Sequence, residues 1–167
     1  MPLSSLPPRN LERQELERLV ARLAADPEMW REHAGAPVGE RRFVSLHRDD
    51  YVDIWVITWA ACGDTGWHDH DISSGAVHVA EGELRECNPR LGAEAVERMI
   101  GPGQTFSFGP DHIHRLCGRA ERSISIHAYS PPLWRLGQYA IDAQGVMRRL
   151  SISYADELRP LGEPLAA

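Results

Sequence analysis

Two histidines separated by a single residue are the feature of this sequence most suited to chemistry. They stand in the stretch Trp67-His68-Asp69-His70-Asp71. On an extended strand, side chains two positions apart point to the same side, so both imidazoles can reach one metal ion. Two ligands do not complete a site, and the best source of a third is Asp111-His112-Ile113-His114. His112 and His114 share a face by the same parity, so spacing alone does not choose between them.

A second polar pattern lies in the segment 123–132. Ser125, His127 and Tyr129 alternate with Ile126 and Ala128. On a strand these three polar side chains would line one face and could form a hydrogen-bonded row. The alternative is a polar stripe that faces solvent, which is common on antiparallel sheets. A Ser-His-Asp hydrolase fits poorly, because the sequence has no G-x-S-x-G nucleophile elbow.

The elements expected to position these residues are mostly β-strands. From residue 37 onward, short runs of β-branched and aromatic residues are divided by Gly, Pro, Asp and Asn about every ten residues. The predicted strands are 42–46, 51–59, 75–80, 83–86, 95–100, 104–108, 112–116, 123–129, 138–142 and 146–153, and a hairpin turn is expected at 143–145. No long amphipathic helix separates them, which argues against a parallel βαβ sheet. We therefore expect a mainly β fold, a double-sheet jelly roll or barrel of the group that includes cupins.

A short helical segment precedes the strands. Apolar residues recur near helical spacing from Leu11 to Leu23, with Asn10 as the expected N-cap. Asp26-Pro27 should end this helix, and a second helical turn is expected over 28–33. We predict a single cupin domain over 1–167, with a helical lead at 1–36, a β-barrel core at 37–155 and a tail at 156–167.

Both histidine segments follow the pattern of the two cupin motifs. A glycine-bearing loop at 62–66 precedes the first pair, and the turn Gly109-Pro110 precedes the second. The common cupin metal site adds a glutamate four or five positions after the first pair, where this sequence has Ser74 and Gly75. A site of three neutral nitrogens leaves the charge of a divalent ion available to an anion such as a thiolate. Zinc also accepts three histidines and activates water, so hydrolysis or hydration remains open.

Composition indicates a globular protein that acts on small molecules. The 167 residues are 43% hydrophobic and 25% charged, and the formal charge of −6 argues against binding nucleic acid. Cys62, Cys87 and Cys117 are an odd number without CxxC spacing, so reduced thiols are expected. The sequence shows neither an apolar run long enough to span a membrane nor a signal-peptide pattern at its start, so we expect a cytoplasmic protein with no membrane partner.

Taken together, these residues resemble a known family. The segments that carry the likeness are Trp67-His68-Asp69-His70, Ser74-Gly75-Ala76, residues 81–86, His114-Arg115 and Ser125-Ile126-His127-Ala128-Tyr129-Ser130-Pro131-Pro132. The chain resembles the cysteine dioxygenase family of cupin thiol dioxygenases over roughly residues 40 to 150. This resemblance implies an iron enzyme that uses O2 and a small thiol substrate.

The resemblance also implies roles for individual residues. His68, His70 and His114 match the three Fe(II) ligands, and Ser125, His127 and Tyr129 match a Ser-His-Tyr row whose tyrosine points at the substrate. Arg48 matches the arginine that binds the substrate carboxylate, with Arg41 and Arg42 nearby. Gly75 stands where mammalian members carry a cysteine crosslinked to the tyrosine, so Tyr129 is expected to be free of a crosslink.

The activity implied is oxidation of L-cysteine to cysteine sulfinate. A dioxygenase for 3-mercaptopropionate or another thiol acid is the first alternative. A zinc or nickel cupin acting as an isomerase or lyase, and a cupin that binds without catalysis, are two further alternatives. A monomer or small homo-oligomer is expected.

Overall fold

The computed structural model of the chain describes residues 3–90, 92–141 and 146–153. The hairpin turn predicted at 143–145 and the tail predicted at 156–167 lie outside these residues. The N-terminal elements are η1 (Leu3–Ser5), α1 (Arg13–Ala24) and η2 (Pro27–Met29). The strands are β1 (Arg41–Arg48), β2 (Asp53–Ala60), β3 (Trp67–Asp69), β4 (Ser74–Glu81), β5 (Leu84–Arg90), β6 (Ala93–Ile100), β7 (Thr105–Phe108), β8 (Arg115–Gly118), β9 (Arg122–Ser130), β10 (Arg135–Ile141) and β11 (Met147–Ser153).

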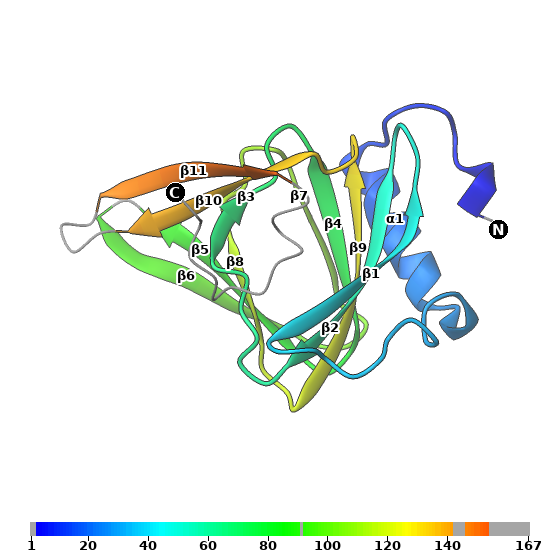
Figure 1. The fold of residues 1–167 in the computed structure, drawn as a ribbon, viewed down its shortest axis with the longest axis horizontal. Helices are drawn as coiled ribbons and strands as arrows, with labels where there is room; N and C mark the ends of the chain where they lie inside the picture. Colours follow the sequence, from blue (N-terminus) through cyan, green and yellow to red (C-terminus); the bar gives the residue numbers. More distant parts are fainter. Residues whose placement is uncertain (1–2, 91, 142–145, 154–167) are drawn as a thin grey trace.

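The strands form three antiparallel sheets. Five strands pair in the order β1-β2-β9-β4-β7, three in the order β11-β10-β3 and three in the order β6-β5-β8. Figure 1 shows the two smaller sheets on one side of β4 and β9 and the helix α1 on the other. The mainly β, jelly-roll-like prediction is therefore confirmed, with the helical lead lying against the largest sheet.

The central strands of the five-stranded sheet are buried on both faces. On the helix side, α1 contributes Leu16, Leu19 and Val20 to a cluster that includes Ile124 and Ile126 of β9. On the barrel side, a second cluster includes Trp55, Trp59 and Tyr129. Each large apolar side chain removed from water stabilises the fold by about 1.5–3 kcal/mol. Because α1 covers the apolar positions of β9, the alternate polar positions of that strand face the interior of the barrel.

The helix begins two residues later than its predicted cap requires. Asn10 is not the N-cap: Glu12 holds that position, and α1 starts at Arg13. The carboxylate of Glu15 accepts a hydrogen bond from the backbone N–H of Glu12 at 2.9 Å and forms an ion pair with Arg9. The hydrogen bond from Glu12 to Glu15 satisfies a backbone N–H group that the helix itself leaves unpaired. The second helical turn is a 3-10 turn over Pro27–Met29, followed by turns to residue 33.

Strand boundaries differ from the prediction mainly around the histidines. The strand predicted at 112–116 is β8, which begins only at Arg115. The three-residue β3 carries His68 and was not predicted as a separate strand. It is held from one side by β10, through Gln138 opposite His68. No helix in the described ranges has the length and apolar character needed to cross a membrane.

Candidate metal centre

Three histidine side chains meet inside the barrel. His68 lies in β3, His70 follows that strand, and His114 immediately precedes β8. The backbone N–H groups of His68 and His114 each donate to the other's carbonyl oxygen, at 2.9 and 3.0 Å. One ring nitrogen from each of the three imidazoles lies within 4.8 Å of the others. The structure thus joins the two histidine segments, and it places His114, not His112, beside His68 and His70.

The clustered imidazoles are in a state suited to binding a cation. Burial, and then the neighbouring histidines, lower the pKa of His70 well below its ordinary value. Burial lowers the pKa of His114 to about 3, although Glu86 opposes that shift. Nε2 of His114 is buried and has no hydrogen-bond partner among the described residues. Neutral imidazoles with unpaired nitrogens are the form that binds divalent transition metals, so this cluster fits a metal ion.

A buried carboxylate stands behind His114. Oε1 of Glu86 lies 2.8 Å from Nδ1 of His114 and 2.9 Å from Nε2 of His112, and the Glu86 side chain has no exposed surface. Arg98 forms an ion pair with the second oxygen of Glu86. Burial raises the pKa of Glu86, but the hydrogen bonds from His112 and His114 outweigh it and hold the pKa well below its ordinary value. An ionised Glu86 accepts the Nδ1–H of His114 and leaves Nε2 as the nitrogen for a metal.

We expect Glu86→Gln to weaken Fe(II) affinity by about 10- to 100-fold, the usual effect of removing a partner that orients a metal-binding histidine. The amide keeps the shape of the side chain but loses the charge that strengthens the bond to His114. Competition with a coloured chelator measures the affinity directly. Glu97→Gln is the matched control, because Glu97 is half exposed and pairs with Arg85. Equal affinities for the two variants would remove Glu86 from the centre.

The predicted polar row is formed, and it is buried. Nε2 of His127 lies 2.7 Å from Oγ of Ser125, and Nδ1 of His127 lies 3.1 Å from the hydroxyl of Tyr129. All three residues are at most 5% exposed, so they are not a solvent-facing stripe. Burial, followed by the charges of nearby histidines, lowers the pKa of His127 to about 3, which keeps this imidazole neutral.

A fourth residue, Trp59, determines which atom donates and which accepts in each hydrogen bond of this row. Its indole Nε1–H donates to Oγ of Ser125 at 2.8 Å. The only remaining partner of the Ser125 hydroxyl among the described residues is His127, so its proton goes to Nε2. The neutral ring must then carry its own proton on Nδ1 and donate it to the Tyr129 oxygen. Tyr129 accepts within the row and keeps its O–H as a donor.

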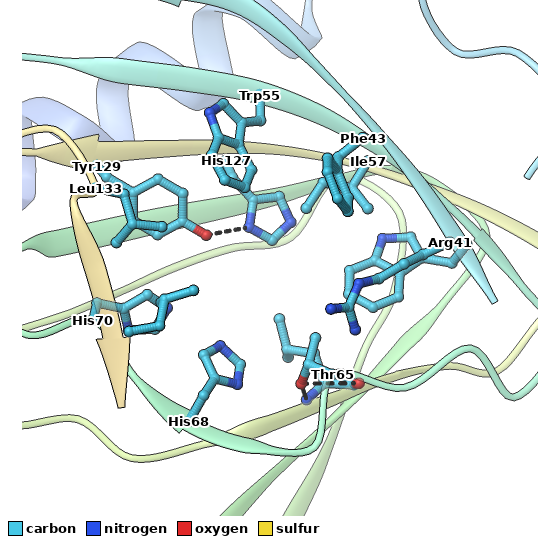
Figure 2. Close-up of a pocket in the computed structure, with 13 residues that line it drawn as sticks. Arg41, Phe43, Trp55, Ile57, Thr65, His68, His70, His127, Tyr129 and Leu133 are labelled. Atoms are coloured by element: carbon cyan, nitrogen blue, oxygen red, sulfur yellow. Dashed lines mark hydrogen bonds between the residues drawn. The ribbon is translucent and has the colours of Figure 1, made fainter. Parts of the chain in front are cut away.

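His68, His70, His127 and Tyr129 border one cavity, shown in Figure 2. Most of its wall is apolar: the residues are Phe43, Trp55, Ile57, Trp59, Leu116, Leu133 and Leu136. The only arginine in the wall is Arg41, whose guanidinium points into the cavity on the side opposite His70. NH1 of Arg41 donates to the carbonyl oxygen of Asp64 at 2.5 Å, which fixes the guanidinium in place.

Arg48, the predicted carboxylate anchor, does not belong to this wall. It forms an ion pair with the fully buried Asp53, donates to the carbonyl oxygen of Leu133 at 3.1 Å and stacks over the ring of Trp134. The other oxygen of Asp53 accepts from the indole of Trp55 at 2.7 Å. The guanidinium of Arg48 therefore compensates a buried carboxylate, and of the two arginines it is Arg41 that borders the cavity.

Asp69, between the two histidines, faces away from the cluster. Its carboxylate accepts from Arg149 at 2.7 and 2.9 Å and from the hydroxyl of Tyr139 at 2.6 Å. It also accepts from the backbone N–H of Gly137 at 3.0 Å. These bonds tie the short strand β3 to β10 and β11, so Asp69 holds the strand that carries His68.

Comparison with known proteins identifies a family. The model of the family described as cysteine dioxygenase type I matches residues 7–142, which include every residue of the histidine cluster and of the polar row. The match covers well over half of the 167 residues.

Several solved structures share the fold at low sequence identity. A cupin superfamily protein from Desulfitobacterium hafniense has a TM-score of 0.53 at 13% identity, over 61% of this chain and 87% of that one. KdgF from Halomonas sp. has a TM-score of 0.51 at 13% identity, over 59% and 84%. An oxalate oxidase in complex with glycolate has a TM-score of 0.50 at 17% identity, over 60% and 57%. At these identities the likeness shows the fold alone, and the fold is that of cupins.

Proposed function

Because this chain belongs to the cysteine dioxygenase type I family, we propose that it is an Fe(II)-dependent thiol dioxygenase whose substrate is a small carboxylated thiol, with L-cysteine as the first candidate. The reaction adds both atoms of O2 to sulfur, so that R–S⁻ and O2 give R–SO2⁻ without another reductant. The observation that carries the proposal is one cavity bordered by His68 and His70 of the histidine cluster, by Tyr129 and by Arg41.

His68, His70 and His114 would hold the iron. When bound, Fe(II) would supply the place where thiolate and O2 are brought together and the electronic route that lets O2 react with sulfur. Three neutral ligands leave the metal's positive charge to attract an anionic sulfur. The same cluster would accept zinc, which is the basis of the isomerase and lyase alternatives.

The protein's own side chains would orient the substrate. A guanidinium matches a carboxylate with two parallel charge-assisted hydrogen bonds, so Arg41 would fix the end of the substrate remote from sulfur. Fixing that end limits the positions of the sulfur relative to the histidines. Tyr129, whose hydroxyl oxygen accepts from His127, would donate its O–H toward the reacting atoms. The apolar wall would exclude water from them.

A second substrate class is favoured by one feature of the wall. None of the thirteen lining residues is Asp or Glu, so an ammonium group would find no carboxylate there. A thiol acid without an amine, such as 3-mercaptopropionate, carries no ammonium group that would need a carboxylate partner in this cavity. It is therefore our second candidate.

The test is oxygen consumption by iron-loaded protein across a set of thiols. We expect turnover with L-cysteine or 3-mercaptopropionate, and much less with cysteamine, which lacks the carboxylate. The ratio of kcat/KM for the two acids identifies the class. Full occupancy by zinc or nickel in the purified protein, together with no thiol-dependent oxygen uptake after iron loading, would reject the dioxygenase and favour an isomerase, a lyase or a binding protein.

A further inference from the structure

The imidazole of His70 differs from the other two in how it is held. Nδ1 of His68 bonds to the carbonyl oxygen of Gly66 at 3.1 Å, and Nδ1 of His114 bonds to Glu86 at 2.8 Å. The corresponding nitrogen of His70 is buried with no hydrogen-bond partner among the described residues. Histidines that bind metals almost always use their second nitrogen in a hydrogen bond that fixes the ring. The orientation of His70 must therefore come from packing.

Two aromatic rings supply that packing. The centroid of Phe108 lies 4.5 Å from that of His70, with 30° between the ring planes. The centroid of Tyr129 lies 5.3 Å from that of His70, at 27°. Phe108 and Tyr129 are themselves 6.4 Å apart, so the three rings form one compact cluster. Phe108 also meets His114 edge-on at 4.9 Å, and it is only 2% exposed.

Gly75 provides the space for the Phe108 ring. In the sheet, Gly75 of β4 lies opposite Phe108 of β7 on one side and opposite Tyr129 of β9 on the other. A Cβ atom at this position would lie 2.4 Å from Cζ of Phe108 and 3.1 Å from Cδ1 of Tyr129. The first distance is a clash with the edge of the rigid Phe108 ring, which also packs against the rings of His70 and His112. Any residue larger than glycine would have to push Phe108 out of its contact with His70.

We propose that Phe108 is a positioning residue for His70, and that Gly75 is required because it lets the phenyl ring reach that histidine. The ring limits the orientations of an imidazole whose Nδ1 no hydrogen bond restrains, which keeps its other nitrogen in position beside those of His68 and His114. This inference rests on the metal site of the proposed function, but it does not depend on which reaction the metal supports.

Phe108→Leu should weaken metal affinity by about 10-fold, because leucine keeps the site apolar but offers His70 no flat face. Phe106→Leu is the matched control. Phe106 lies on the same strand, is 6% exposed and packs against Phe108 at 6.1 Å, and its nearest clustered histidine is His114 at 6.4 Å. We expect Phe106→Leu to reduce thermal stability but not affinity. Zinc affinity from chelator competition and the unfolding temperature without metal separate the two effects.

Gly75→Ala tests the same contact without shortening Phe108, and it should also weaken zinc affinity. If both variants fail to fold, NMR of the wild-type protein decides: a phenyl ring at this position should shift the ring protons of His70 upfield relative to those of His68. Unchanged affinity in Phe108→Leu, equal loss in Phe106→Leu, or unshifted His70 protons would overturn the proposal. Normal zinc binding without thiol oxidation would instead count against the proposed function alone.

Discussion

Replacing Arg41 by alanine should raise the KM for a carboxylated thiol by about 100-fold. The guanidinium would make two hydrogen bonds to the carboxylate, each worth at least about 1.5 kcal/mol because both partners are charged. A loss of about 3 kcal/mol corresponds to two factors of ten in affinity. The KM of Arg41→Lys should lie between those of the wild type and Arg41→Ala, because an ammonium keeps the charge but not the planar guanidinium. Initial rates of oxygen uptake over a range of thiol concentrations give KM and kcat separately.

Arg48→Ala is the informative control, because the resemblance alone had pointed to Arg48. Here we expect an unchanged KM and a less stable protein. Asp53 has no exposed side-chain surface and would lose its ionic partner. Breaking a buried pair usually costs about 3–5 kcal/mol, and the 26% exposure of the Arg48 side chain reduces our expectation to about 2 kcal/mol. Urea unfolding measures this difference. A raised KM in Arg48→Ala with a normal KM in Arg41→Ala would restore the original assignment.

The difference between the two arginines shows where sequence reasoning reached its limit. Arg41 pairs with Trp59 and Arg48 pairs with Asp53 across β1 and β2, but the register shifts between Ser45 and His47. A β-bulge of this kind adds a residue to one strand and changes which side chains share a face. Counting alternate residues along β1 would put the two arginines, seven positions apart, on opposite faces, whereas the bulge puts both on one face. They differ in their place along the strand, and no local pattern in the sequence shows which end of β1 borders the cavity.

The histidine pair was easier to predict because its geometry is local. Residues two apart on a strand share a face whatever surrounds them. His68 lies in β3 and His70 directly follows it, so this rule needed only a very short stretch of extended chain. The partner histidine needed a long-range contact. The choice of His114 came from the resemblance, and the structure adds the paired backbone bonds between His68 and His114.

Glu86 and Trp59 were given no role from the sequence, and each acts through a contact far along the chain. Glu86 reaches His114 from a different strand, and Trp59 reaches Ser125 across the sheet. One signal for Glu86 was available: it lies two residues after the fully buried Leu84 and so shares its inward face. A charged residue at an inward position requires partners, and the clustered histidines were the candidates. Trp59 carried no comparable signal, because a buried tryptophan is ordinary in a core.

Tyr129→Phe should lower kcat by about 100- to 1000-fold while leaving metal content unchanged, the usual effect of removing one hydrogen-bond donor aimed at developing charge. Phenylalanine keeps the ring that packs against His70 and removes only the hydroxyl. The row cannot compensate, because His127 already donates its single proton toward position 129 and Ser125 is committed to His127. Single-turnover oxygen uptake together with iron analysis separates lost chemistry from lost metal.

Tyr139→Phe provides the comparison that gives this loss its meaning. Tyr139 also uses its hydroxyl in a hydrogen bond, to Asp69 at 2.6 Å, but it is not among the residues that line the cavity. Its variant should lose some stability and keep its turnover. If Tyr129→Phe retained full turnover, the tyrosine would not take part in the reaction, and the polar row would be a buried network that only rigidifies β9. If Trp59→Phe lowered turnover while iron stayed bound, the direction of the row would matter as well as its presence, because the indole is what commits the serine proton to His127.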